Sequence, residues 1–162
     1  MIHRLEHPDR IAVGTIGEVG QRLFLIQARE GRRLVVVKVE KDQVAILASW
    51  LARVVRTMSR PGELAVDVEL EPEYEIDLVA GEITVAIDES DLAEQIEVTI
   101  LPAEDDGDTL VVTLSKEQAA SFAIRAVQLI ESGRPPCPLC GLPLDKRGHD
   151  CPRTNGHHAP LR

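Results

Sequence analysis

The sequence contains few aromatic residues and, over a long central stretch, no basic residue. Its aromatic residues are Phe24, Trp50, Tyr74 and Phe122. A core in this chain must therefore be built from aliphatic side chains. Residues 61–115 contain no Lys or Arg but 17 of the 27 acidic residues, and the net charge is −9. Such a surface repels a nucleic-acid backbone or an anionic membrane, and it serves either solubility or the docking of a basic partner.

The chain also lacks the marks of a membrane or secreted protein. No apolar run approaches the roughly 18 residues of a membrane-spanning helix, and residues 1–4 lead directly into charged residues rather than a signal peptide. The three cysteines are an odd number and cluster in one tail, which argues against a secreted disulfide framework. We therefore predict a cytoplasmic protein.

The central region of the sequence is predicted to be duplicated. LVVVKVEKDQVA at residues 34–45 aligns with TLVVTLSKEQAA at residues 109–120, and in both an apolar strand leads into a helix that begins near a Gln. Upstream segments also correspond in pairs, 22–30 with 96–104 and 11–17 with 83–89. Each half therefore reads strand, strand, strand, helix.

The predicted fold class is α+β, with two tandem β-β-β-α repeats that form a mainly antiparallel sheet with two packed helices. Repeat one covers residues 8–60, an acidic connector covers residues 61–73, and repeat two covers residues 74–133, each within a few residues. Residues 134–162 form a separate tail. The sequence leaves open whether the repeats share one sheet or form two sheets.

Apolar residues recur at helical spacing in both halves. The two predicted stripes are Val44, Leu47, Ala48, Leu51, Val54, Val55 and Met58, and Ala119, Phe122, Ala123, Ala126, Leu129 and Ile130. Ser115 and Gln118 predict a capping box. Residues 23–26 and 82–87 alternate as half-buried antiparallel strands do. Residues 63–81 are less regular and predict either an edge strand or an acidic connector.

The tail contains the residues with the clearest chemistry. Cys137 and Cys140 form a Cys-x-x-Cys pair, and Cys151 follows closely after His149. Thiolates and imidazoles at such spacing are the preferred ligands of tetrahedral zinc, and a tail this short and polar needs a metal to hold a fold. We predict a zinc-ribbon-like site formed by Cys137, Cys140, His149 and Cys151, with His157 as the alternative fourth ligand.

Other interpretations of the tail stay open. One alternative is that the cysteines are reduced thiols in an unstructured tail. Another is that Cys137 and Cys140 form a redox pair, although no thioredoxin-like βαβ pattern surrounds them. Four protein ligands would make the zinc structural, whereas Thr154 in place of a fourth cysteine makes an open, catalytic position conceivable.

Three segments resemble a known family. The opening IHRLEHPDRIAVGTIGEVGQRLFLIQARE, the helix starts KDQ and LSKEQA, and the ending GRPPCPLCGLPLDKRGHDCPRTNGH are similar to the actinobacterial conserved hypothetical proteins known as domain of unknown function 3090. The resemblance covers nearly the whole chain and is most specific in the tail. It implies no established activity, and it implies gene neighbours that encode a histidine-phosphatase-like and a kinase-like protein.

The predicted function is a non-enzymatic, zinc-stabilised binding or adaptor protein that acts through protein–protein contacts, because no convergent catalytic set is present in the sequence. The first alternative is a zinc-dependent or cleft-based enzyme of unknown reaction. The second is a nucleic-acid-associated protein that uses the basic tail, which the acidic body disfavours. Trp50 lies off the predicted apolar stripe and is either a contact residue or a shielded rim residue.

Overall fold

The computed structural model describes residues 1–18, 20–65, 68–87, 94–132, 149–150 and 158–159. The chain divides into two compact units, Met1–Val127 and Gln128–Arg162. The predicted boundary between residues 133 and 134 lies outside the described residues. No helix in the described ranges is long and apolar enough to cross a membrane.

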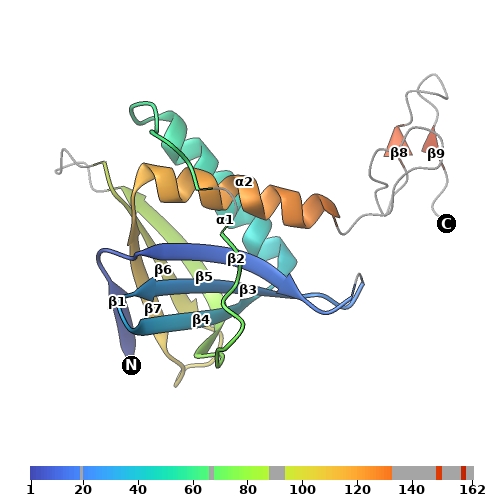
Figure 1. Cartoon of the computed structure of the whole chain (residues 1–162). Coiled ribbons are helices and arrows are strands. Elements are labelled where there is room, and N and C mark those ends of the chain that lie inside the picture. Colours follow the sequence, from blue (N-terminus) through green and yellow to red (C-terminus); the bar gives the residue numbers. More distant parts are fainter. Residues whose placement is uncertain (19, 66–67, 88–93, 133–148, 151–157, 160–162) are drawn as a thin grey trace. The chain divides into compact units, whose positions relative to one another are not determined.

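The first unit is built on one seven-stranded sheet (Figure 1). In chain order its strands are β1 (Ile2–Leu5), β2 (Arg10–Ile16), β3 (Leu23–Glu30), β4 (Arg33–Val39), β5 (Leu78–Ile87), β6 (Ile96–Pro102) and β7 (Thr109–Leu114). Their spatial order is β1-β7-β6-β5-β4-β3-β2. Neighbouring strands are antiparallel except in the parallel pairs β1–β7 and β4–β5. The two halves of the chain therefore share one sheet.

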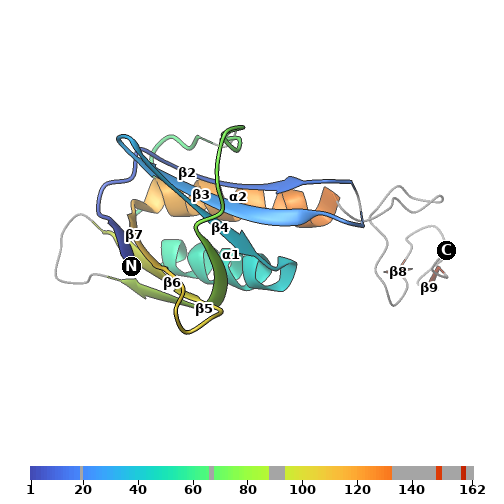
Figure 2. The same cartoon turned by 90° about the horizontal axis from the view of Figure 1, so that it is seen from below.

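The two ends of this sheet approach each other. β1 and β2 are the outermost strands, yet only residues 6–9 join them, and so short a link spans little distance. The Arg33 guanidinium of β4 donates to the Arg4 carbonyl of β1 at 3.5 Å. Figure 2 shows the strand groups β2–β4 and β5–β7 at an angle to each other. The sheet is therefore strongly curled.

β1 was not predicted from the sequence. It has only four residues, and its stability depends on parallel pairing with β7, where Ile2 lies opposite Thr109. His3 Nε2 lies 2.9 Å from Asp108 Oδ2, and this hydrogen bond lowers the pKa of Asp108, with a smaller contribution from the Met1 ammonium. A partner more than a hundred residues away leaves no local sequence signal.

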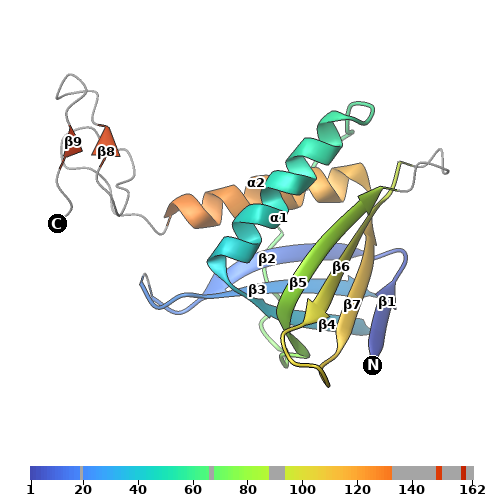
Figure 3. The ribbon, with the colours of Figure 1, turned by 180° about the vertical axis from the view of Figure 1, so that it is seen from behind.

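Two helices, α1 (Lys41–Arg56) and α2 (Lys116–Ser132), lie on one side of the sheet (Figure 3). Both predicted helices are confirmed. Val44, Leu47, Ala48 and Leu51 of α1 are buried, as are Ala119, Phe122, Ala123 and Ala126 of α2. The predicted capping box is present: the Gln118 N–H donates to Ser115 Oγ at 3.1 Å, and the Ser115 N–H donates to Gln118 Oε1 at 3.0 Å.

The core lies between the helices and the concave face of the sheet. Side chains from both halves surround a residual internal cavity of about 10 Å³: Ile11, Ile26, Leu47, Leu51, Val98, Ile100, Leu110, Val112, Leu114 and Phe122. Phe122 is the one aromatic residue in this set, so the prediction of an aliphatic core is confirmed. The α+β class is confirmed as well.

The segment between α1 and β5 is an acidic connector, and its described residues 68–77 contain no strand. It crosses the outer face of β2–β4. The Glu71 N–H donates to Gln27 Oε1 at 2.6 Å, and Gln27 Nε2 donates to the Glu71 carbonyl at 3.2 Å. Leu70 lies directly against Gly14, where a Cβ atom would come within 2.5 Å of Leu70 Cγ. This close approach requires glycine.

The connector also explains why the predicted half-buried alternation is wrong for β3. Ile26 faces the helices and Leu25 faces outward, yet their exposed fractions are 1% and 0%. The outer face is covered by the chain itself, so β3 is buried on both faces. β5 follows the prediction from residue 82 to residue 86, because Ile83 and Val85 are half-buried and Thr84 and Ala86 are exposed. Ile87, predicted on the same face as Ile83 and Val85, is exposed instead.

Candidate binding groove between helix α1 and strand β5

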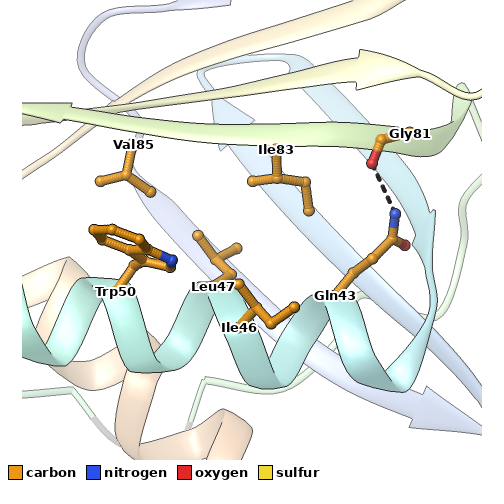
Figure 4. A pocket seen from close by; sticks show the side chains of 7 residues that line it. All are labelled: Gln43, Ile46, Leu47, Trp50, Gly81, Ile83 and Val85. Carbon is orange, nitrogen blue, oxygen red and sulfur yellow. Dashed lines mark hydrogen bonds between the residues drawn. The ribbon is translucent and has the colours of Figure 1, made fainter.

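A groove with a volume of about 210 Å³ runs between α1 and β5 (Figure 4). We call it the α1–β5 groove. Its lining residues are Gln43, Ile46, Leu47, Trp50, Gly81, Ile83 and Val85. The Trp50 ring lies across from Val85, and Ile46 and Leu47 lie across from Ile83 (Figure 4). The lining is apolar except for Gln43, which stands at one end.

The groove exists because β5 diverges from β4. The ladder between them contains only the pairs Val37–Leu78 and Lys38–Val79, after which β4 ends and the chain enters α1. The register between β5 and β6 shifts after Ala80, as a β-bulge requires. Gly81 lies in this bulge, and a Cβ there would come within 2.7 Å of the Pro102 carbonyl oxygen. Residues 83–87 pair with β6 on one edge, and residues 81–87 have no strand neighbour on the other edge among the described strands.

Gln43 closes one end of the groove with a fixed set of hydrogen bonds. Its Oε1 accepts from the Glu40 N–H at 2.8 Å, which satisfies a free donor at the start of α1. Its Nε2 donates to the carbonyls of Ala80 at 3.2 Å and Gly81 at 2.8 Å. The helix start is thereby tied to the strand at the bulge.

The other end of the groove is apolar and exposed. The exposed fractions of Ile46 and Trp50 are 59% and 50%, and Trp50 is the single tryptophan of the chain. The Arg53 guanidinium carbon lies 5.3 Å from the centroid of the Trp50 ring, in a cation–π contact. Arg53 makes no ion pair with another described residue. The exposed end therefore carries an available positive charge.

A second groove lies between α2 and β2. Two adjacent depressions of about 140 and 10 Å³ form it, and their shared walls come from β2, α2 and the connector. Ala65 and Val68 of the connector line both depressions, together with Ile11 and Ser121. The Arg125 Nε is buried in this region and has no hydrogen-bond partner among the described residues. The chain's own connector thus forms one wall of this second groove.

A polar cluster joins the end of α1 to the start of α2. The Glu94 carboxylate accepts hydrogen bonds from the Ser59 hydroxyl, from the Ser59 N–H at 2.8 Å and from Lys116 Nζ at 3.1 Å. These hydrogen bonds, those from Ser59 first, lower the pKa of Glu94 to about 2. Lys116 Nζ also donates to Ser59 Oγ and forms an ion pair with the Glu94 carboxylate at 3.1 Å. These contacts of Ser59, Glu94 and Lys116 connect the end of α1 to the start of α2.

The structure describes one of the predicted metal ligands. His149 lies in β8 (His149–Asp150), which pairs antiparallel with β9 (His158–Ala159) in the second unit. His149 is opposite Ala159, and Asp150 is opposite His158. Cys137, Cys140, Cys151 and the alternative ligand His157 lie outside the described residues. Within the described ranges, no group of three or more His, Cys, Asp or Glu residues is placed to hold a metal.

Comparison with protein families gives one match, which covers residues 3–151 and is described as Protein of unknown function (DUF3090). The chain belongs to this family. The resemblance drawn from the opening, the helix starts and the tail is therefore confirmed. Neither the curated proteins nor the solved structures gave a match.

For this family member, the sequence indicated part of the groove. The helical stripe placed Leu47 in the core, and the alternation of β5 placed Ile83 and Val85 on one face, both as the structure has them. The sequence predicts that Trp50 is either a contact residue or a rim residue, and the structure shows it exposed in the groove. The missed signal is the pair Ile46 and Trp50, which lie one turn apart on the polar side of α1.

Proposed function

We propose that this protein is a non-enzymatic binding or adaptor protein that holds a protein partner in the α1–β5 groove. The observation that carries this proposal is the exposure of Ile46 and Trp50 beside the half-buried Ile83 and Val85. Contiguous exposed apolar side chains are typical of interaction sites. Tryptophan is also enriched among the residues that dominate binding energy.

The chemistry of the groove favours binding over catalysis. Its seven lining residues include no titratable side chain, and Gln43 already uses both ends of its amide in hydrogen bonds. General acid–base or nucleophilic catalysis requires such groups within reach of a substrate. The enzyme alternative therefore has no support from this groove.

We also propose that the two halves of the first unit are tandem copies. Three strands and a helix occur twice in the same order, β2-β3-β4-α1 and β5-β6-β7-α2. Gln43 and Gln118 occupy the same position at the start of their helices. Each binds the region where the other half begins, because Gln118 Nε2 donates to the Pro8 carbonyl at 2.8 Å just before β2, as Gln43 does to β5.

For the tail, we propose a structural zinc held by Cys137, Cys140, Cys151 and His149, with His157 as the alternative to His149. The proposal is supported by the chemistry of the donors, since three thiolates and an imidazole suit zinc. The β8–β9 ladder supports it further, because it brings His149 beside a returning segment of chain. Bound zinc would supply folding stability to a segment too small to fold alone.

The partner proposal is tested by affinity capture of the full chain from its own cells, with quantitative mass spectrometry. Ile46→Arg places a charge in the groove at an exposed site. Ile124→Arg is the matched control, because Ile124 is also exposed on a helix but lies on α2 outside the groove. We expect proteins that co-purify with the wild type and the control but not with Ile46→Arg. Equal recovery with all three proteins would contradict the proposal.

The zinc proposal is tested by elemental analysis of the untagged protein. We expect one zinc per chain, and its loss in Cys151→Ser together with rapid proteolysis of the tail. His149→Ala distinguishes the two candidate ligands, because full zinc retention there would assign the fourth position to His157. Absence of metal from a folded wild-type protein would rule out zinc and leave Cys137 and Cys140 to be tested as a redox pair.

A further inference from the structure

We infer that the ligand of the α1–β5 groove is an extended segment of the partner that carries aliphatic side chains and a carboxylate near Trp50. This inference rests on the proposed function and specifies its partner. It follows from the free edge of β5 and from the second groove, along which the chain's own connector packs.

The two grooves correspond residue by residue. The alignment of the repeats relates α1 to α2 by an offset of 75 positions and β5 to β2 by an offset of 72 positions. Every residue that lines the α1–β5 groove has its counterpart in the walls of the second groove. The pairs are Gln43 with Gln118, Ile46 with Ser121, Leu47 with Phe122, Trp50 with Arg125, Gly81 with Asp9, Ile83 with Ile11, and Val85 with Val13.

The second groove shows what such a site accepts. The connector packs along it and forms one of its walls with Ala65 and Val68. The described residues on either side of the pair 66–67 are in neither helix nor strand. Two further contacts hold the connector: the Arg10 guanidinium donates to the Glu69 carbonyl, and Arg29 pairs with Glu71 at 2.6 Å. A non-helical segment with aliphatic and acidic residues therefore packs along a groove of this kind.

In addition to its apolar walls, the α1–β5 groove presents free backbone groups of β5 to an extended ligand. The edge of β5 from residue 81 to residue 87 has no strand neighbour on the groove side among the described strands. Alternate residues on such an edge direct a backbone N–H and C=O outward. An extended segment can bond to these groups while its side chains enter the groove, and a helical ligand cannot.

The charge near the groove indicates the sign of the charge that the ligand carries at one end. Arg53 stacks on Trp50 and forms no ion pair with a described residue. A carboxylate on the ligand would therefore supply the missing partner of the Arg53 charge. A second copy of this chain fits less well. Antiparallel pairing of β5 with β5 of another copy would place the exposed Glu82 side chains of both copies on one face of the joined sheet, and like charges opposite each other there are destabilising.

The test is a selection from random dodecapeptides displayed on phage, with the full chain as the immobilised target. We expect enriched peptides in which aliphatic residues alternate with others, because alternate side chains of an extended segment face the same way. We also expect an acidic residue at one end. Synthetic versions of these peptides should produce a saturable change in the emission of Trp50, the only tryptophan.

Three variants locate the binding site. Ile46→Arg should weaken peptide binding at least tenfold, on the order of 1.4 kcal/mol or more, and Ile124→Arg should leave it unchanged. Arg53→Glu should reduce the affinity for peptides with the acidic end and leave that for their amide counterparts largely unchanged. N-methylation of alternate peptide nitrogens should abolish binding in one register only, because only one set of N–H groups faces β5.

Other outcomes would overturn the inference. It fails if no peptide is enriched, if enriched peptides carry apolar residues at helical spacing, or if they bind Ile46→Arg as well as the wild type. A dimer that Ile46→Arg dissociates and Ile124→Arg does not, measured by sedimentation, would assign the groove to a second copy. Groove-dependent capture of a cellular protein together with a failed peptide selection would leave the proposed function standing and remove only the extended ligand.

Discussion

The two three-stranded halves of the sheet differ in how much of their surface the chain covers. In the β2–β4 half, the helices cover one face and the connector covers the other, so β3 and β4 have central residues that are buried on both sides. In the β5–β7 half, the outer face of β5 and β6 is exposed at Thr84, Ala86 and Glu97. The first half is closed by its own chain, and the second is left open for contact.

One segment accounts for the difference. The connector follows α1 and lies against the half that precedes it, where Arg10 and Arg29 on the outer face pair with the Glu71 carboxylate at 3.7 and 2.6 Å. The corresponding outer face of β5 and β6 carries Glu82 and Glu97 instead, which an acidic segment would avoid. Electrostatic complementarity thus directs the cover to one half only.

The largest expected effect is the difference between two inner-face residues, one in β3, which is covered on both faces, and one in β5, whose outer face is exposed. Ile26→Ala should lower the free energy of unfolding by about 2–5 kcal/mol, because it leaves a cavity in a fully buried site. Val85→Ala should cost about 1 kcal/mol or less, since Val85 lines a groove that is already open. Urea unfolding monitored by circular dichroism measures both, and equal costs would contradict the difference between the halves.

A second comparison adds bulk to the two outer faces. Gly14→Val should destabilise the protein by about 1–3 kcal/mol, because the new side chain collides with Leu70 of the connector. Ala86→Val on the exposed face of β5 is the matched control and should change stability by about 0.5 kcal/mol or less. Faster proteolysis of the connector in Gly14→Val would show that the connector no longer packs on the outer face of β2–β4. An unchanged stability would mean that the connector is not tightly seated.

A third comparison uses pH to test two carboxylates that accept hydrogen bonds, Glu94 in the second half and Glu71 in the connector that covers the first half. Hydrogen bonds from Ser59 and Lys116 lower the pKa of Glu94 to about 2 from an ordinary value of 4.5, and a hydrogen bond from Arg29 lowers that of Glu71. A lowered folded-state pKa gives stability that is present above pH 4.5 and is lost as the pH falls toward 2.

Glu94→Gln should therefore reduce the loss of stability between pH 4.5 and pH 2, and its effect should be small because Glu94 is partly exposed. Glu71→Gln should have the same sign. Thermal unfolding at a series of pH values measures both. An unchanged acid dependence in Glu94→Gln would show that its carboxylate is not held by Ser59 in solution.

The smallest effect is expected at the rim of the open groove. Arg53→Ala removes the cation–π contact with Trp50, which should cost below about 1 kcal/mol at an exposed site. The emission of Trp50 should nevertheless change, because the guanidinium that covers its ring is gone. A large loss of stability would indicate that Arg53 supports the fold rather than the groove.

Local patterns were sufficient to predict the helices and most of the strands. The stripe of α1, the capping box of Ser115 and Gln118, and the alternation of β5 all act within a few residues. β1 escaped prediction because its pairing partner β7 is distant in sequence. The double burial of β3 is not predicted because no local pattern shows that residues 68–77, more than 40 positions further along the chain, lie against its outer face.

The groove was only partly predictable for a similar reason. Helical periodicity identifies which residues of α1 enter the core, but Ile46 and Trp50 lie outside the stripe, where a single sequence offers no way to distinguish a contact surface from a shielded one. Their role depends on where β5 separates from β4. The predicted ligands Cys137, Cys140 and Cys151 lie outside the described residues, so the tail site stays a prediction from donor chemistry.

The sequence by itself determined the α+β class, the two helices, the aliphatic core and membership of the family, because each depends on short-range periodicity or on a contiguous motif. Only the tertiary structure decided that the halves share one curled sheet, that the connector lines one groove, and that the other groove has no such segment against it among the described residues. These features depend on contacts between residues far apart in the chain, whose free energies appear only when the whole sheet has formed.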